Sequence, residues 1–224
     1  MRKPSKEFID RINAQLVSSL TTLGFKKRSS DFLTYALSKE FLGTVALSRA
    51  VEQGEKTLLL VPQIGITSTE VEKALKSLTG ERFQSTIVKQ LGYLLPGHTF
   101  KNWSFSEHDP CDETIENIVA GIKQFAIPFF LDHQSLAAIC GKLETMEYPA
   151  PVSCELMFPI ALALLNQKER AKVFILKRLT ELKKDDKRRN IPIDIQHGFY
   201  AFALKFSKHY FIEKDSLEVM AILQ

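Results

Sequence analysis

Three apolar runs between Gly24 and Ser68 limit most strongly what this chain can fold into. The runs are Phe32–Leu37, Leu42–Ala50 and Thr57–Ile66, and short polar turns separate them. Each run is predicted to be a β-strand, because it is bounded by turn residues and has strand-like length. The short turns favour an antiparallel meander, since each strand can pair with the one before it. Apolar residues elsewhere then need a face of this sheet for their burial.

The segments around the meander predict an α+β domain over residues 1–147. Before it, apolar residues at helical spacing predict a helix over Lys6–Leu23 that Gly24 ends. After it we expect a helix from Thr69 to Gly80, strands over Thr86–Leu95 and Lys101–Phe105, and helices over Asp112–Phe125 and Gln134–Leu143, with Pro128 interrupting the helical region. One core beneath the sheet is expected to contain Val45, Leu47, Leu58, Leu60, Ile115 and Ile122.

The last third of the chain has a different pattern and predicts a helical C-terminal subdomain over residues 151–224. Helical spacing appears in Cys154–Leu165, Glu169–Leu182 and Ile195–Phe211. The two prolines of Tyr148–Pro151 indicate the boundary between the domains. We expect the subdomain to pack on the first domain, because three helices alone bury little apolar surface.

The composition favours a cytoplasmic protein that does not enter a membrane. The three cysteines are odd in number and widely spaced, which is typical of a reducing compartment rather than a disulfide framework. The first ten residues are basic and polar, with no apolar segment after them, so no signal peptide is expected. The longest apolar run, Leu156–Leu165, has about half the length that a membrane span needs.

The reactive side chains do not form a pattern that predicts catalysis, and no metal or cofactor is expected. His98, His108, Cys111 and His133 lack the closely spaced pairs that aim two ligands at one zinc ion. Cys140 lies among apolar residues of a predicted helix, which favours a buried thiol over a nucleophile. The alternative is an enzyme whose site is assembled from residues distant in sequence.

Four residues are candidates for contact with a partner: Lys26, Lys27, Arg28 and Trp103. The basic group opens the predicted sheet, and the one tryptophan could anchor a partner on an exposed sheet face. The alternative for Trp103 is a core position. The net charge of +4 is mild over 224 residues, so nucleic acid is not favoured, although an adaptor that binds nucleic acid stays an alternative.

Several short motifs resemble those of a bacterial family. They are Leu23-Gly24-Phe25-Lys26-Lys27-Arg28 before the meander, Val61-Pro62-Gln63-Ile64-Gly65 in its third strand, Trp103 before an acidic helix, and Ile127-Pro128-Phe129-Phe130. The family is known as a domain of unknown function, and some members lie beside toxin genes and are regarded as immunity proteins. The resemblance covers about residues 6–144 and implies an α+β fold without known catalytic residues.

The expected function is therefore that of a non-catalytic protein-binding protein. The resemblance implies, more finely, an immunity protein that neutralises a cognate bacterial toxin. Because the chain carries a positive balance, we expect the contact face of its protein partner to be neutral or acidic.

Overall fold

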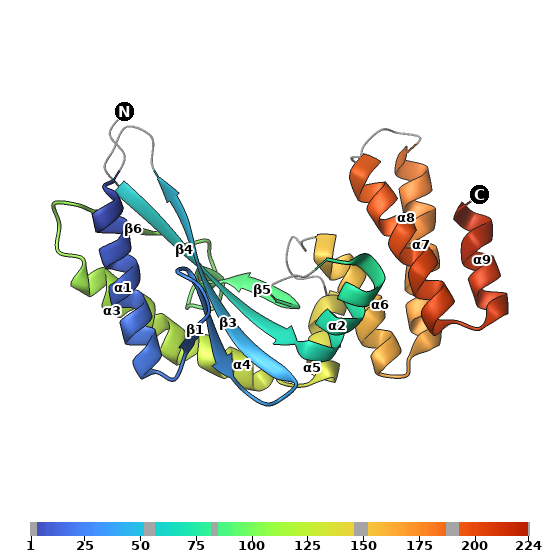
Figure 1. Cartoon of the computed structure of the whole chain (residues 1–224), viewed down its shortest axis with the longest axis horizontal. Helices are drawn as coiled ribbons and strands as arrows, with labels where there is room; N and C mark the ends of the chain where they lie inside the picture. Colours follow the sequence, from blue (N-terminus) through green and yellow to red (C-terminus); the bar gives the residue numbers. More distant parts are fainter. Residues whose placement is uncertain (1–3, 52–56, 82–84, 146–151, 187–192, 224) are drawn as a thin grey trace. The chain divides into compact units, whose positions relative to one another are not determined.

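The computed structural model describes residues 4–51, 57–81, 85–145, 152–186 and 193–223 (Figure 1). It confirms the predicted α+β class: the chain forms an antiparallel sheet, and helices precede and follow the strands in the sequence. The chain forms two compact units. The sheet unit comprises residues 1–68 and 87–134, and the helical unit comprises residues 69–86 and 135–224.

The sheet unit contains the predicted meander. Within the described residues the sheet has six strands: β1 (Lys26–Lys27), β2 (Phe32–Ala36), β3 (Phe41–Val51), β4 (Thr57–Ser68), β5 (Ile87–Gln90) and β6 (Trp103–Ser106). Strands β1 to β4 pair in sequence order, and both β5 and β6 pair with the free side of β4. Strands β2, β3 and β4 correspond to the three predicted runs, and each begins and ends within two residues of its predicted bounds.

The register of β3 and β4 places the core on one face of the sheet. Val45 lies opposite Ile64, and Arg49 lies opposite Leu60, two pairs before the end of β3. Side chains alternate between buried and half-buried along most of β4, as expected for a sheet with one drier face. Each member of the predicted core set is at most 5% exposed, which confirms the prediction: Val45, Leu47, Leu58, Leu60, Ile115 and Ile122.

Pro62 marks the point where the outer pairing of β4 changes partner. Strand β6 pairs with β4 as far as Leu60, and β5 begins to pair at Gln63. Leu47, the partner of Pro62 in β3, donates its backbone N–H to Asp31 on the β2 side, so the nitrogen of Pro62 faces the β5 and β6 side. Proline has no N–H to donate there. The missing donor of Pro62 therefore lies at the gap between the pairing of β6 and the pairing of β5 along β4.

The helices of the sheet unit lie on one side of the strands, at the lower left of Figure 1. They are α1 (Lys6–Thr22), α3 (Asp112–Gly121), the π-helical segment η2 (Ile122–Ala126) and α4 (Ile127–Asp132), with a short 3₁₀ turn η1 (Leu91–Tyr93) after β5. Ser5 caps α1 by accepting a hydrogen bond from the Phe8 N–H, and Gly24 follows the helix with φ +95°.

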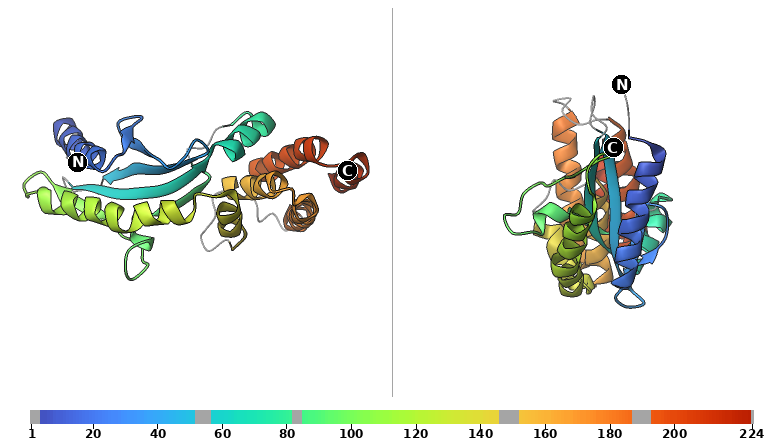
Figure 2. Two further views of the ribbon diagram at one scale, coloured as in Figure 1. Left: turned by 90° about the horizontal axis from the view of Figure 1, so that it is seen from below. Right: turned by 90° about the vertical axis from the view of Figure 1, so that its left-hand side faces the viewer.

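Pro128 does not break the helical region, contrary to the prediction. Figure 2 shows α3, η2 and α4 as one nearly continuous rod along the sheet. Helix α3 ends at Gly121, and the N–H of Ile127 bonds to the carbonyl of Ile122, five residues earlier. This wider turn lies directly before the proline, which cannot donate the next helical bond. The helix therefore continues through a π-helical turn rather than ending there.

The helical unit contains α2 (Thr69–Thr79), α5 (Leu136–Thr145), α6 (Val152–Leu164), α7 (Lys168–Asp186), α8 (Ile193–Tyr210) and α9 (Glu213–Leu223). Helices α2 and α5, predicted in the first domain, group with the C-terminal helices because α2 contacts α6 and α8, and α5 contacts α6. The predicted boundary at residues 148–151 lies outside the described residues. Packing of residues 151–224 on the first domain stays a prediction. None of the described helices combines the length and the apolar character of a membrane span.

Candidate functional site

The predicted basic group lies together at one edge of the sheet. Lys26 and Lys27 form β1 opposite Thr34 and Leu33, and both lysines are exposed. Arg28 follows them, and its Nε donates a hydrogen bond to Thr34 Oγ1 at 3.1 Å. Exposed lysines on a short edge strand also discourage pairing with another sheet, so their position has a structural reason apart from any partner.

Trp103 does not join this group, and the prediction that it anchors a partner on an exposed face is wrong. The residue is 5% exposed and lies opposite Leu60 on the core face. The ammonium of Lys101 lies 5.1 Å from the centroid of its ring. Strand β6 is four strand spacings from β1, on the order of 19 Å. Trp103 therefore occupies a core position, which was the alternative interpretation of this residue from the sequence.

The residues considered for zinc lie on three segments: His98 in the loop before β6, His108 and Cys111 in the loop after β6, and His133 after α4. His98 and His133 place a ring nitrogen against the carbonyls of Tyr93 and Phe129, and the thiol of Cys111 lies 3.4 Å from the carbonyl of Asp109. Among the described residues, no three His, Cys, Asp or Glu side chains gather as ligands for a metal ion.

Two of the three thiols are buried. Burial raises the pKa of Cys140, and it also raises the pKa of Cys111, where the carboxylates of Asp112 and Asp109 add to the effect. Cys154 is half-buried. A thiol with a raised pKa forms little thiolate near neutral pH, so Cys111 and Cys140 are placed as packing residues rather than nucleophiles.

We expect Cys154 to react first with iodoacetamide at pH 8, with Cys111 and Cys140 labelled more slowly. Peptide mass spectrometry measures the three rates, and the chain in urea is the control in which all three should react alike. Because the folded state holds the two thiol protons more tightly, its stability should fall as the pH rises above the unfolded thiol pKa of about 8.5. Rapid labelling of Cys140 in the folded chain would contradict the burial argument.

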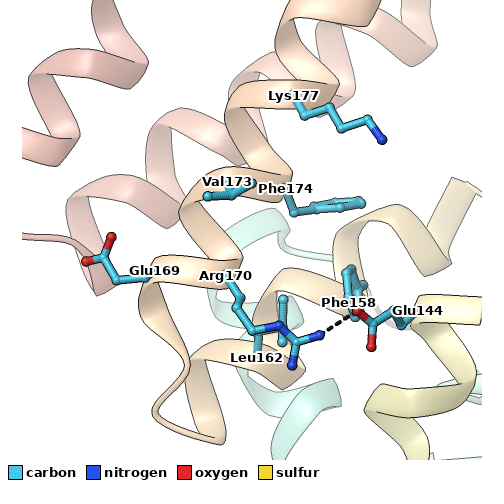
Figure 3. A pocket seen from close by; sticks show the side chains of 8 residues that line it. All are labelled: Glu144, Phe158, Leu162, Glu169, Arg170, Val173, Phe174 and Lys177. Atoms are coloured by element: carbon cyan, nitrogen blue, oxygen red, sulfur yellow. Dashed lines mark hydrogen bonds and ion pairs between the residues drawn. The ribbon is translucent and has the colours of Figure 1, made fainter.

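A hollow on the helical unit brings together residues that were not singled out from the sequence. It lies between α5, α6 and α7 and has a volume of about 350 Å³ (Figure 3). Its lining consists of Glu144, Phe158, Leu162, Glu169, Arg170, Val173, Phe174 and Lys177. The rings of Phe158 and Phe174 meet edge to face, with centroids 5.0 Å apart. Val173 is 65% exposed at the rim.

A second hollow continues the first along α7. It has a volume of about 220 Å³, shares Phe174 and Lys177 with the first, and is otherwise lined by Glu155, Arg178 and Glu181. We call the two hollows together the α7 groove. It extends from Glu169 to Glu181, a rise of about 18 Å along the helix.

Most charged groups of the α7 groove are paired with each other. The guanidinium of Arg170 binds the carboxylate of Glu144, and this hydrogen bond raises the pKa of Arg170. Arg178 reaches both oxygens of Glu155, with N–O distances of 3.0 and 2.8 Å. A bidentate pair of this kind fixes its own geometry. The groove therefore has an apolar floor and walls fixed by ion pairs.

One sequence signal could have indicated this groove. Val173, Phe174, Ile175 and Leu176 are four consecutive apolar residues in a helix whose other face is charged. Four consecutive helical positions span the whole circumference, so one side chain must point away from the core. Ile175 is buried, and Val173, two residues earlier, is the one that points outward.

Comparison of the chain with protein-family models, with curated proteins and with solved structures gives no significant match in any of the three. The family resemblance therefore stays a prediction.

Proposed function

We propose that the chain is a non-catalytic protein-binding protein that neutralises a bacterial toxin. The observation that carries the binding part is the α7 groove. Phe158 and Phe174 line it, and Val173 is exposed at its rim. An apolar hollow with one exposed apolar side chain at its rim and a charged border suits a surface that a protein partner covers.

The arrangement of charge in the groove supports binding over acid–base catalysis. General acid–base chemistry needs a group that is free to take or give a proton at the reacting atom. Glu144 and Glu155 instead bind the guanidinium groups of Arg170 and Arg178. Paired groups of this kind suit recognition, because they keep the border of the groove in one geometry.

The toxin part of the proposal rests on the family resemblance and on charge. The exposed lysines of β1 and the net charge of +4 suit a partner whose contact face is neutral or acidic. The basic edge and the α7 groove are then the two surfaces to test for contact.

A toxin co-expression assay tests the proposal. The chain is produced together with the product of a toxin reading frame adjacent to its gene, and growth is measured. We expect protection to fail when an interface is disrupted, either by charge reversal of Lys26, Lys27 and Arg28 together or by Val173→Glu. Protection should persist in Cys111→Ala, Cys140→Ala and His108→Ala, because none of these side chains lies in either surface.

Each variant is first shown to fold, from its far-UV circular dichroism and from the fluorescence of Trp103. If the single cysteine or histidine variants lost protection while both surface variants kept it, the binding proposal would be overturned and an enzyme with a distant-residue site would take its place.

A further inference from the structure

We infer that Lys26 and Arg28 form a two-point site for two carboxylates of a partner protein, and that Thr34 positions Arg28 for this contact. The inference deepens the proposed function and rests on it, because it names the side chains of the basic edge that bind and the groups that they select. Lys27, which lies between the two cations in the sequence, is outside the site.

The alternation of side chains along β1 places Lys26 and Arg28 on one face of the sheet. Lys26 lies opposite Thr34, and Lys27 lies opposite Leu33, which is fully buried on the core face. The Nε of Arg28 reaches Thr34 Oγ1, so Arg28 shares the face of Lys26. Two residues of extended chain separate the two cations, which corresponds to about 7 Å between their Cα atoms.

Arg28 is held in place by the protein but has no anion of its own. Its Nε donates to Thr34 Oγ1 at 3.1 Å, and Thr34 is only 6% exposed, so the hydroxyl is fixed in the sheet. The carboxylates of the described residues include none within ion-pair distance of Arg28. By contrast, ion pairs join Arg49, Arg170 and Arg178 to carboxylates. The two Nη groups of Arg28 therefore remain for a bidentate contact with an oxyanion.

The carboxylate of Asp31, in the same turn, does not compete for this site. It accepts a hydrogen bond from Ser29 Oγ at 2.8 Å and lies 3.7 Å from the guanidinium of Arg49. The hydrogen bond from Ser29 lowers the pKa of Asp31, so this group remains charged within its own turn. Lys26 and Arg28 are both exposed, and the described part of the chain offers neither of them a carboxylate. Their positive charge is therefore available to a partner.

The surroundings of the site suit a protein segment rather than nucleic acid. Phe32, Thr44 and Ala46 continue this face along β2 and β3, and none of them carries a charge. Nucleic acid binds through many successive phosphates, and its affinity grows with the number of cations that meet them. An extended protein segment places alternate side chains on one face at the spacing of the site. Asp or Glu at every second residue therefore matches Lys26 and Arg28.

Selection of displayed peptides tests the inference with the full chain. The probe is a yeast-displayed library of short linear peptides, sorted for binding to the wild-type chain at physiological ionic strength. We expect the enriched peptides to carry Asp or Glu at alternate residues. Arg28→Gln should weaken them about tenfold, because it removes a bidentate contact, and Lys26→Gln should weaken them about twofold to fivefold. Lys27→Gln is the matched control: it removes the same charge from the other face and should change the affinity by less than about twofold.

Substitution of Thr34 separates positioning from charge. Thr34→Val keeps the β-branched shape but removes the hydroxyl that accepts from Arg28, so it should weaken the enriched peptides about threefold. Thr34→Ser keeps the hydroxyl and should restore the wild-type affinity, which a purely structural role of Thr34 would not predict. Urea unfolding followed by the fluorescence of Trp103 shows that each variant is folded before its affinity is measured.

Enriched peptides without alternate carboxylates, or with equal affinity losses in Lys27→Gln and Arg28→Gln, would overturn the two-point site. Unchanged affinity in Thr34→Val would overturn the positioning role of Thr34. Single-stranded DNA that displaces the peptides at physiological ionic strength would assign the site to phosphates and overturn the choice of carboxylates. The proposed function fails separately: acidic peptides that depend on Lys26 and Arg28, without toxin protection, keep this inference and remove the toxin. Full protection by the double variant Lys26→Gln, Arg28→Gln keeps the function and overturns this site as its contact.

Discussion

Replacing Phe130 by alanine is expected to lower the free energy of unfolding of the sheet unit by about 3–5 kcal/mol. The ring is fully buried and lies 6.3 Å from the rings of both Phe25 and Tyr35, centroid to centroid. It also covers Gly43 of β3, so closely that an added Cβ there would lie 2.5 Å from the ring. Removing the ring leaves a cavity between α4 and the sheet that the rigid strands cannot fill.

The same contact predicts that Gly43→Ala destabilises the chain by about 1–3 kcal/mol, because a methyl group would overlap the Phe130 ring. In the Phe130→Ala background this cost should largely disappear. The two substitutions therefore form a double-mutant cycle with a strong coupling, as expected for residues in direct contact.

Urea unfolding followed by the fluorescence of Trp103 measures the cycle, because Trp103 is the one tryptophan of the chain and is buried in the same unit. Phe100→Ala is the control for ring removal, since Phe100 is exposed in the loop between η1 and β6. It should change stability by less than about 0.5 kcal/mol. Additive effects of Gly43→Ala and Phe130→Ala would show that the ring is not what requires glycine at position 43.

The central sheet was predictable from the sequence because its signals are local. The turns between the apolar runs are short, and alternation along β3 already separates Val45 and Leu47 from Thr44 and Ala46. Strand β1 was not predicted, since two lysines carry no apolar period. Its pairing with β2 depends on the tertiary position of the chain after Gly24, and no sequence window contains that information.

The helices were less predictable, because their ends and their stability depend on contacts between residues that are distant in sequence. Pro128 was expected to end a helix, and a π-helical turn accommodates it instead. Helix α9 was missed, because its stability depends on distant partners: Lys172 of α7 binds the carboxylates of Asp215 and Glu218. These two carboxylates raise the pKa of Lys172 and hold its charge at every physiological pH.

The candidate site shows the limit of sequence reasoning most clearly. Lys26, Lys27 and Arg28 were found because a run of charge is visible in the sequence. The α7 groove joins Glu144, Phe158 and Phe174 from three helices, and their proximity depends on how those helices pack. Trp103 was misplaced because residue type alone does not tell an exposed strand face from a buried one.

The second large effect is expected in the helical unit, where Phe206→Ala should lower the free energy of unfolding by about 3–5 kcal/mol. Phe206 is fully buried in α8, and its ring centroid lies 5.6 Å from Phe202, 4.7 Å from Tyr210 and 5.4 Å from Phe211. These rings form a row along one side of the helix and into the turn before α9. Loss of the central ring removes contacts from all three neighbours at once.

Hydrogen exchange read by mass spectrometry locates this effect. The hydroxyl of Ser216 in α9 donates to the carbonyl of Ser207 in α8, next to Phe206, so α8 and α9 should lose protection together. Ile212→Ala is the matched control, since Ile212 lies in the same turn but is 68% exposed, and its removal should leave both helices protected. If α9 kept its protection in Phe206→Ala, the ion pairs of Lys172 rather than the aromatic row would be what holds α9 in place.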